Sequence, residues 1–303
     1  MKNNLSERKF KRSYGDKIFD IVNVLLMVAL LIVFIWPLWF VVIASLSDPS
    51  QVYLGNVLVL PKGFRLDAYK EMFAYERIWI GYGNTILYTV VGTLLNLIMT
   101  ICCAYPLSRK NFKPRKVLQW VFMFTMYFSG GLIPSYLVMK NLGLVNTRAA
   151  MVITGAMSVY NMLIVRSYFL NSIPEELNEA SILDGANEAQ YLIKVALPLS
   201  KPVIAVVGLY YALGHWNDFY TALIYINESD YHPLQYVLRE ILILSENVET
   251  FQQMSPEEIM RKLQLQQTLK YSTIIAACLP MLCVYPFIQK YFVKGVMVGA
   301  VKG

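Results

Sequence analysis

Residues 21–46 read IVNVLLMVALLIVFIWPLWFVVIASL and contain no Asp, Glu, Lys or Arg. A helix needs about 20 apolar residues to cross the hydrocarbon core of a bilayer, because its backbone N–H and C=O groups must bond one another. The run is far longer than the apolar region of a cleaved signal peptide, which has about 7–15 residues. It therefore predicts a membrane-spanning helix that is kept in the protein.

Five further apolar stretches have or approach the same length. The chain of 303 residues is 56% hydrophobic and 16% charged, whereas a soluble domain carries about 25% charged residues. We therefore expect an all-α membrane protein with six transmembrane helices. Gly130, Gly131 and Pro134 predict that the third of these is bent, since Gly and Pro interrupt regular helix bonding. The five stretches are residues 86–107, 117–139, 149–165, 202–226 and 271–289.

Basic residues near the span ends predict the orientation, because Lys and Arg are retained on the cytoplasmic side during insertion. They gather before the first span, between the second and third, between the fourth and fifth, and after the last. Both termini are therefore expected in the cytoplasm. This placement also accounts for the net charge of +7, so we expect no nucleic-acid partner. The residues are Lys2, Arg8, Lys9, Lys11, Arg12, Lys17, Arg109, Lys110, Lys113, Arg115, Lys116, Arg166, Lys194, Lys201, Lys290, Lys294 and Lys302.

The spans and their flanking charges predict the organisation of the chain. Outside the membrane, a short amphipathic helix is expected over residues 66–73, and a second helix from Ser255, as its cap, to Leu269. The predicted parts are a cytoplasmic segment 1–20, the first span 21–46, an extracellular segment 47–80, a permease core 81–291 that includes a cytoplasmic loop 172–198 and an extracellular loop 227–270, and a cytoplasmic tail 292–303.

The loop between the fourth and fifth spans carries the most specific pattern. Residues 172–186 read SIPEELNEASILDGA, in which Ser172 caps a helix and Gly185 ends it in the left-handed conformation. A second short helix is expected to begin at Asn187 and to end before Leu197-Pro198. The first helix would present Leu177, Ala180 and Leu183 at helical spacing, a pattern suited to a hydrophobic groove on a cytoplasmic partner.

This loop resembles a known family motif. Glu179-Ala180-Ser181, three residues, Gly185, nine residues and Val195-Ala196-Leu197-Pro198 are similar to the EAA loop of ABC importer permeases, with Ser181 and Val195 as size-conserving departures. The resemblance implies the type I ABC importer permease fold and a coupling role for the loop. The implied ATPase-coupling residues are Glu175, Glu176, Leu177, Glu179, Ala180, Ser181, Leu183, Asp184, Gly185, Ala186, Val195, Leu197 and Pro198.

The resemblance extends over nearly the whole chain, through residues 81–85, 215–219, 292–295 and 301–303. It is most similar to the MalG-type half of carbohydrate importers, in particular to the LplC/YtcP-like subgroup. This implies an oligosaccharide importer in the bacterial plasma membrane. It also implies as partners a second homologous permease subunit, two ATPase subunits, an extracellular solute-binding protein and membrane lipid. The tail would reach the ATPase dimer.

Several polar and aromatic side chains are candidates for a transport pathway or gate. Aromatic faces stack on sugars, and an ionisable residue inside a span is a functional candidate because burying it is costly. Asp218 is such a residue, with His215 or Asn217 as its expected partner in packing or gating. The whole set is Tyr127, Tyr136, Tyr160, Asn161, Tyr211, His215, Trp216, Asn217 and Asp218.

The extracellular segment after Tyr231 is the candidate contact for the binding protein, because the corresponding loop of the resembling family has that role. An ordinary surface helix is the alternative reading of this segment. The candidate contact residues are Pro233, Leu234, Gln235, Arg239 and Glu240.

The sequence contains no phosphate-binding loop of the Gly-x-x-x-x-Gly-Lys-Ser/Thr type. ATP and Mg²⁺ are therefore expected on a partner ATPase, and this chain is expected to be neither an enzyme nor the carrier of a cofactor. Its histidines and cysteines show no metal-ligand spacing, so no metal site is expected. Two alternatives stay open: an ABC permease for a non-sugar solute, and a secondary carrier, which would need coupling-ion ligands within its own spans.

Overall fold

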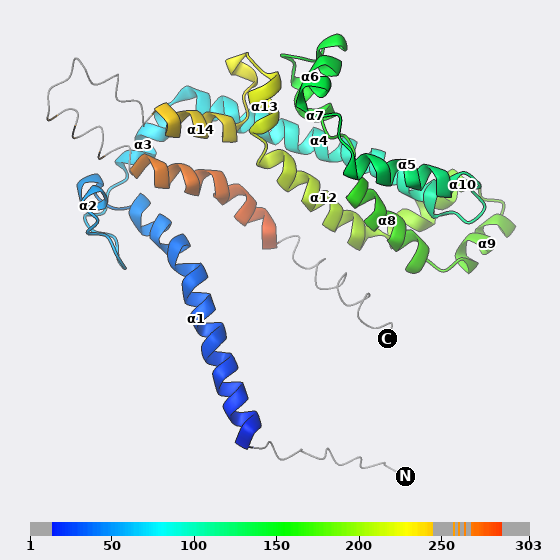
Figure 1. Ribbon diagram of the computed structural model, residues 1–303, viewed down its shortest axis with the longest axis horizontal. Helices are drawn as coiled ribbons and strands as arrows, with labels where there is room; N and C mark the ends of the chain where they lie inside the picture. The colour runs from blue at the N-terminus through cyan, green and yellow to red at the C-terminus, as the bar shows by residue number, and fades with distance from the viewer. Residues whose placement is uncertain (1–13, 245–256, 258–259, 261–263, 265–267, 287–303) are drawn as a thin grey trace. The chain divides into compact units, whose positions relative to one another are not determined.

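The computed structural model describes residues 14–244, 257, 260, 264 and 268–286. The chain divides into two compact units, one of residues 1–69 with 254–275 and one of residues 70–253 with 276–303. The assigned elements of this part of the chain are helical (Figure 1). The helix predicted over 255–269 falls largely outside the described residues, and the predicted tail 292–303 does so entirely.

The first unit is built around α1, Tyr14–Ser45, a helix of 32 residues. It begins before the predicted Ile21, because Tyr14 to Asp20 contain no helix-breaking proline and Asp16 suits the first turn of the helix dipole. Its apolar side chains are exposed all around, and only its last three residues are buried. A helix that is apolar on every face is typical of a membrane span.

Two short helices follow α1. These are α2, Pro49–Tyr53, and α3, Asp67–Ala74. The Asp48 side chain caps α2 by accepting the Ser50 N–H at 2.8 Å. The amphipathic helix predicted over 66–73 is confirmed by α3.

The second unit is built around α4, Glu76–Ser108, which packs against α8, α12 and α14. This helix begins ten residues before the predicted Ile86, because Gly81 and Gly83 do not break it. Gly81 is needed for a close approach, since a Cβ there would lie 3.1 Å from the Leu234 Cα. The extended helix therefore packs closely against the segment that contains Leu234.

A stripe of mostly polar residues runs along the buried face of α4. Asn84, Tyr88, Gly92, Asn96 and Thr100 recur every four residues and are all buried. Residues four apart lie on one face of a helix. We call these five residues the α4 stripe, and each of them meets a partner elsewhere in the second unit.

The predicted third span is bent, and the predicted fourth and fifth spans are each divided into two helices. α5, Arg115–Tyr127, and α6, Leu132–Asn141, meet at 114°, which confirms the bend expected at Gly130-Gly131. The prediction of one helix over 149–165 is wrong: α7, Arg148–Ile153, and α8, Val159–Asn171, are separate. The predicted 202–226 is likewise divided into α12, Lys201–Trp216, and α13, Tyr220–Tyr225.

The break between α7 and α8 is closed by side chains from other helices. The Asn96 amide donates to the Gly155 carbonyl at 2.8 Å, and the Ser158 N–H donates to the Tyr211 hydroxyl at 3.0 Å. Thr100 Oγ1 and the Tyr211 hydroxyl lie 2.7 Å apart. Buried backbone groups that leave a helix need such partners, so the α4 stripe stabilises the break.

By length and composition, three helices can cross a membrane, namely α1, α4 and Thr268–Pro286. The number rises to five if each bent pair is one span; the second pair joins Glu188–Leu199 to α12 at 82°. These numbers cover only the residues that the structure describes. The expectation of six transmembrane helices is therefore met as several candidate spans, because the predicted fourth and fifth spans are each divided into two helices.

We expect Gly92→Ala to loosen the packing of α4 against α12. A Cβ at Gly92 would overlap the imidazole of His215, whose Nε2 lies 2.7 Å from the Asn96 Oδ1. Overpacking of this kind costs about 1–3 kcal/mol, to be measured as a lowered melting temperature of the purified assembly. Gly83→Ala on the same helix is the control, because nothing lies within 4 Å of its Cβ position. Equal melting temperatures for the two variants would contradict this account.

Candidate functional site

The predicted loop 172–198 forms a lobe between α8 and α12. It contains α9, Glu176–Leu183, and then α10, Glu188–Tyr191, which continues through the π-helix η1, Leu192–Ala196, into α11, Leu197–Leu199. Figure 1 shows α9 and α10 close together at one end of the second unit. We call residues 172–198 the coupling lobe.

The turn between α9 and α10 confirms two sequence predictions. Gly185 adopts φ +78°, the left-handed conformation in which glycine ends a helix. Asn187 caps α10 with a capping box: its side chain accepts from Gln190 N at 2.8 Å, and the Gln190 side chain accepts from Asn187 N at 2.9 Å. The angle between the two helices is therefore set by local sequence.

Two predictions about the ends of these helices are wrong. Ser172 is the C-cap of α8, its N–H donating to the Tyr168 carbonyl at 2.9 Å, and α9 begins only at Glu176. The second helix does not end before Leu197-Pro198 but runs to Leu199. The π-helical turn shifts the carbonyl register just before Pro198, a residue that has no N–H to donate.

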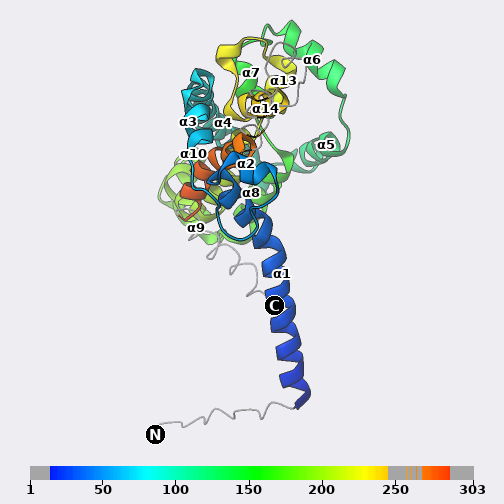
Figure 2. The same ribbon diagram turned by 90° about the vertical axis from the view of Figure 1, so that its left-hand side faces the viewer.

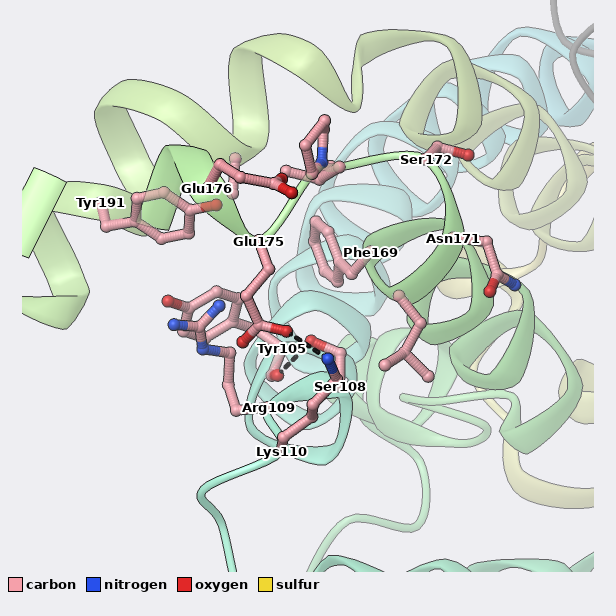
Figure 3. A pocket seen from close by; sticks show the side chains of 14 residues that line it. Tyr105, Ser108, Arg109, Lys110, Phe169, Asn171, Ser172, Glu175, Glu176 and Tyr191 are labelled. Atoms are coloured by element: carbon pink, nitrogen blue, oxygen red, sulfur yellow. Dashed lines mark hydrogen bonds and ion pairs between the residues drawn. The ribbon is translucent and has the colours of Figure 1, made fainter. Parts of the chain in front are cut away.

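The coupling lobe is fastened to the end of α4 by two basic residues. Lys110 Nζ lies 2.6 Å from Glu175 Oε2, just before α9. The Arg109 guanidinium lies 3.6 Å from Glu188 Oε1, at the start of α10, and 5.3 Å from the centre of the Tyr191 ring. One Arg-Lys pair thus holds the chain on both sides of α9, an arrangement that we call the Arg-Lys clamp (Figure 3).

Aromatic packing keeps the clamp in place. Tyr105, one turn before Arg109, donates its hydroxyl proton to Glu188, and the Arg109 guanidinium lies 5.6 Å from its ring centre. The Phe169 ring meets Tyr105 edge to face at 5.9 Å. Such cation–π and aromatic contacts contribute about 0.5–1.5 kcal/mol each.

The ion pair with Lys110 shifts the pKa of the Glu175 carboxyl. The hydrogen bond from the Lys110 ammonium lowers the pKa of the Glu175 carboxyl below its ordinary value. This contact therefore contributes above the ordinary pKa of glutamate, about 4.3, and is lost only as the pH falls through the lowered value. The Glu175 carboxylate is therefore ionised near neutral pH.

A cavity of about 530 Å³ lies between the clamp and the end of α8 (Figure 3). In the close view, the side chains of Tyr105, Arg109, Lys110 and Glu175 gather on one side of it. Its lining residues are Tyr105, Ser108, Arg109, Lys110, Phe169, Leu170, Asn171, Ser172, Ile173, Pro174, Glu175, Glu176, Tyr191 and Ala196.

The outer face of α9 exposes aliphatic side chains. Leu183 is 89% exposed and Ile182 is 57% exposed, and Leu177 and Ala180 are also exposed. Exposed apolar side chains grouped on a polar, charged lobe are typical of a protein contact. Most of the predicted coupling residues lie in or beside α9, whereas Val195, Leu197 and Pro198 lie at the far end of the lobe.

The structure does not gather the predicted pathway residues around one opening. Tyr127 and Tyr160 are exposed, whereas Asn161, Tyr211 and Trp216 are buried. The Trp216 indole donates to the Ala277 carbonyl at 3.0 Å. Tyr136 stacks on Tyr225 with the ring centres 6.0 Å apart. The buried members of the set have packing and hydrogen-bonding roles within the second unit.

The Asp218 side chain bonds main chain rather than the side chains of its expected partners, His215 and Asn217. Asp218 Oδ1 accepts the Thr221 N–H at 3.0 Å at the start of α13. His215 bonds Asn96 of the α4 stripe, and Asn217 donates to the Leu213 carbonyl at 2.9 Å. The carboxylate therefore accepts one of the N–H groups that lack a main-chain partner at the start of α13.

The candidate binding-protein residues lie at and within α14, Leu234–Leu244. Pro233 and Leu234 are buried, so the part of the set open to another protein consists of Gln235, Arg239 and Glu240. Glu240 is also paired with Arg77 of α4 at 2.9 Å. The segment is folded onto α4, as a surface helix would be.

Sequence reasoning missed the Arg-Lys clamp. Arg109 and Lys110 were interpreted only as basic residues of a cytoplasmic loop, and Tyr105, Glu188 and Tyr191 were not singled out. The available signal was an Arg-Lys pair directly after a long apolar helix, together with acids on both sides of the EAA pattern.

The chain matches known proteins over most of its length. Residues 78–298 match the family described as binding-protein-dependent transport system inner membrane component. Protein LplC of Bacillus subtilis (strain 168) is 40% identical over 293 residues, which cover 95% of this chain and 96% of that protein. The polygalacturonan/rhamnogalacturonan transport system permease protein YtcP of the same strain is 37% identical, over 95% of this chain and 99% of its own.

A solved structure has the same fold. It is the crystal structure of a bacterial ABC transporter involved in the import of the acidic polysaccharide alginate. The matching chain is 32% identical and superposes with a TM-score of 0.85, over 93% of this chain and 99% of that one.

We expect Arg109→Ala to loosen the coupling lobe without unfolding the chain. The variant removes the contacts to Glu188 and Tyr191 that hold α10, worth about 1 kcal/mol for such a partly exposed group. Hydrogen exchange of the amides of residues 187–196 should therefore become roughly fivefold faster. Lys113→Ala, an exposed basic residue of the same loop, is the control. Equal protection in both variants would mean that the clamp does not hold the lobe.

Proposed function

Because this chain belongs to the family of binding-protein-dependent transport system inner membrane components, we propose that it forms one half of the translocation pathway of an ATP-driven oligosaccharide importer. The chain is an all-helical, multi-pass protein of the inner membrane. It is a permease subunit of a binding-protein-dependent ABC importer and not itself an enzyme. This membership implies ATPase and binding-protein partners.

The coupling lobe is, in this proposal, the docking element for the ATPase. The observation that carries it is the exposed aliphatic face of α9, above all Leu183, on a lobe that the Arg-Lys clamp holds to α4. A short helix with exposed leucine and isoleucine side chains can dock into a groove with those side chains as anchors. Movement of the ATPase would then reach α4 through Arg109 and Lys110.

The proposed assembly contains a second, homologous permease subunit and two ATPase subunits, with ATP and Mg²⁺ bound by the ATPases. ATP would close the ATPase dimer and open the pathway outward, and hydrolysis would reset it inward. Within this scheme the chain has the six-span type I topology with both termini in the cytoplasm of a bacterium. The basic residues around the lobe and before the first span support this orientation.

The names of two relatives support an acidic oligosaccharide as cargo. One relative is a permease for polygalacturonan or rhamnogalacturonan, and the solved structure belongs to an importer of the acidic polysaccharide alginate. Both cargoes contain uronic acids, whose carboxylates distinguish them from neutral sugars. We therefore place uronic-acid oligosaccharides first among the substrates to test.

Leu183→Asp should uncouple the transporter while leaving it assembled. Burying a leucine side chain contributes about 2 kcal/mol, so losing it would weaken the contact roughly thirtyfold. Binding-protein-stimulated ATP hydrolysis and sugar uptake by the reconstituted complex should fall together. Leu142→Asp, at the end of α6, is the control for an equally drastic change at an exposed leucine.

Two other outcomes would contradict the proposed coupling. If Leu183→Asp retained wild-type stimulation, α9 would not be the docking helix. If vesicles containing this chain without any ATPase took up sugar, the chain would be a secondary carrier, the alternative that the sequence left open.

The cargo proposal predicts which sugars stimulate the complex. Oligosaccharides released from pectin or alginate, added with the cognate binding protein, should stimulate ATP hydrolysis, and neutral oligosaccharides of the same length should not. Methyl esterification of the same pectin fragments removes their charge at nearly constant size and is the matched control. Equal stimulation by esterified and free fragments would exclude carboxylate recognition and leave a neutral cargo.

A further inference from the structure

The extracellular end of the first unit contains a loop with an unusual surface. Residues 57–64 follow α2, and we call them the interface loop. Leu58 and Leu60 are 63% and 68% exposed, and Val59 and Phe64 are exposed to a similar degree. Several large apolar side chains exposed in a row are unfavourable in water unless another phase or molecule covers them.

The interface loop is held in place by hydrogen bonds rather than left free. The Asp48 N–H donates to the Lys62 carbonyl at 2.9 Å, and the Arg65 N–H donates to the Leu46 carbonyl at 3.0 Å. Ser47 Oγ accepts the Lys62 N–H at 3.2 Å. Val57 is buried, so the loop has an inner side and an outer side. The exposure of its apolar side chains is therefore built into the fold.

The loop runs back alongside the membrane-spanning helix α1. The Trp39 Nε1–H donates to the Val59 carbonyl at 2.8 Å. Trp39 precedes the last residue of α1, Ser45, by about 9 Å at 1.5 Å per residue. Helical side chains also lean toward the N-terminus of their helix. The Val59 carbonyl therefore lies at the level of Trp39 or farther from Ser45. Figures 1 and 2 show the segment after α2 beside the last turns of α1.

The length of α1 places the contact between Trp39 and Val59 at the boundary of the membrane. No charged residue lies between Asp20 and Asp48, whereas the hydrocarbon core takes about 20 residues of helix. The last turns of α1 thus extend into the headgroup layer, where tryptophan is enriched because its ring is apolar and its N–H polar. Lys62 is exposed next to the apolar residues, within reach of lipid phosphates.

We propose that the interface loop is a membrane-interface anchor, in which Leu58, Val59, Leu60 and Phe64 insert into the headgroup layer of the leaflet at the C-terminal end of α1. The Trp39 hydrogen bond sets the depth of the loop. The anchor fixes the height of the extracellular segment of the first unit relative to the lipid. Insertion into lipid removes these apolar side chains from water, although they are exposed on the surface of the protein.

Spin labels can test this placement in the whole transporter reconstituted in lipid vesicles. The four native cysteines, Cys102, Cys103, Cys278 and Cys283, are first replaced by serine, and a nitroxide is attached at Leu60→Cys. Collision with oxygen, which concentrates in lipid, is compared with collision with a water-soluble nickel chelate. Leu26→Cys in α1 is the lipid reference, and Lys70→Cys, an exposed charged position in α3, is the water reference.

The oxygen-to-nickel ratio at position 60 should be several-fold higher than at position 70 and approach that at position 26. A ratio equal to that at position 70 would place the loop in water and overturn the proposal. Exclusion of both reagents would mean that a protein covers the loop, which would also overturn it.

A second pair of variants tests the role of Trp39. Trp39→Phe keeps an aromatic ring and removes the N–H donor, so the ratio at position 60 should fall several-fold. Trp36→Phe, one turn earlier on α1, is the matched control and should leave the ratio unchanged. If Trp39→Phe also left it unchanged, the hydrogen bond to Val59 would not set the depth of the loop.

Discussion

Main-chain polar groups inside a membrane protein must find partners, and in this chain the α4 stripe supplies them. Asn96 bonds the carbonyl of Gly155 and Thr100 meets the hydroxyl of Tyr211, so the chain can leave helical geometry between α7 and α8. Without those side chains, the open backbone would be left unsatisfied at a cost of several kcal/mol per group. The stripe therefore stabilises the break between α7 and α8 in the second unit.

The same helix joins the two ends of the second unit. Its first turns hold residues 230–240 through Arg77 and Asn84, and its last turn and the residues that follow hold the coupling lobe through Arg109 and Lys110. A single helix of 33 residues, with Pro106 in its last turn, therefore connects these two sets of contacts. The proposed coupling of an ATPase to a pathway would act along this helix.

Local signals predicted much of this architecture. The apolar run of α1, the bend between α5 and α6, the left-handed Gly185 and the helix start at Asn187 each depend on residues adjacent in sequence. The break at Gly155 could not be predicted, because its partner Asn96 lies 59 residues away in the chain. Arg109 was missed for a similar reason: its position after a span explained its charge before its contacts were known.

The hydrogen bonds at the outer end of α4 have an evolutionary consequence. Asn84 bonds the carbonyls of Asp230 and His232, Tyr88 bonds the carbonyl of Tyr231, and Thr85 accepts the N–H of Leu234. All of these partners are main-chain atoms. The exposed side chain at position 230 can therefore diverge while these main-chain contacts are inherited unchanged, whereas the buried His232 also bonds Arg77 and the Tyr231 ring contacts Arg148.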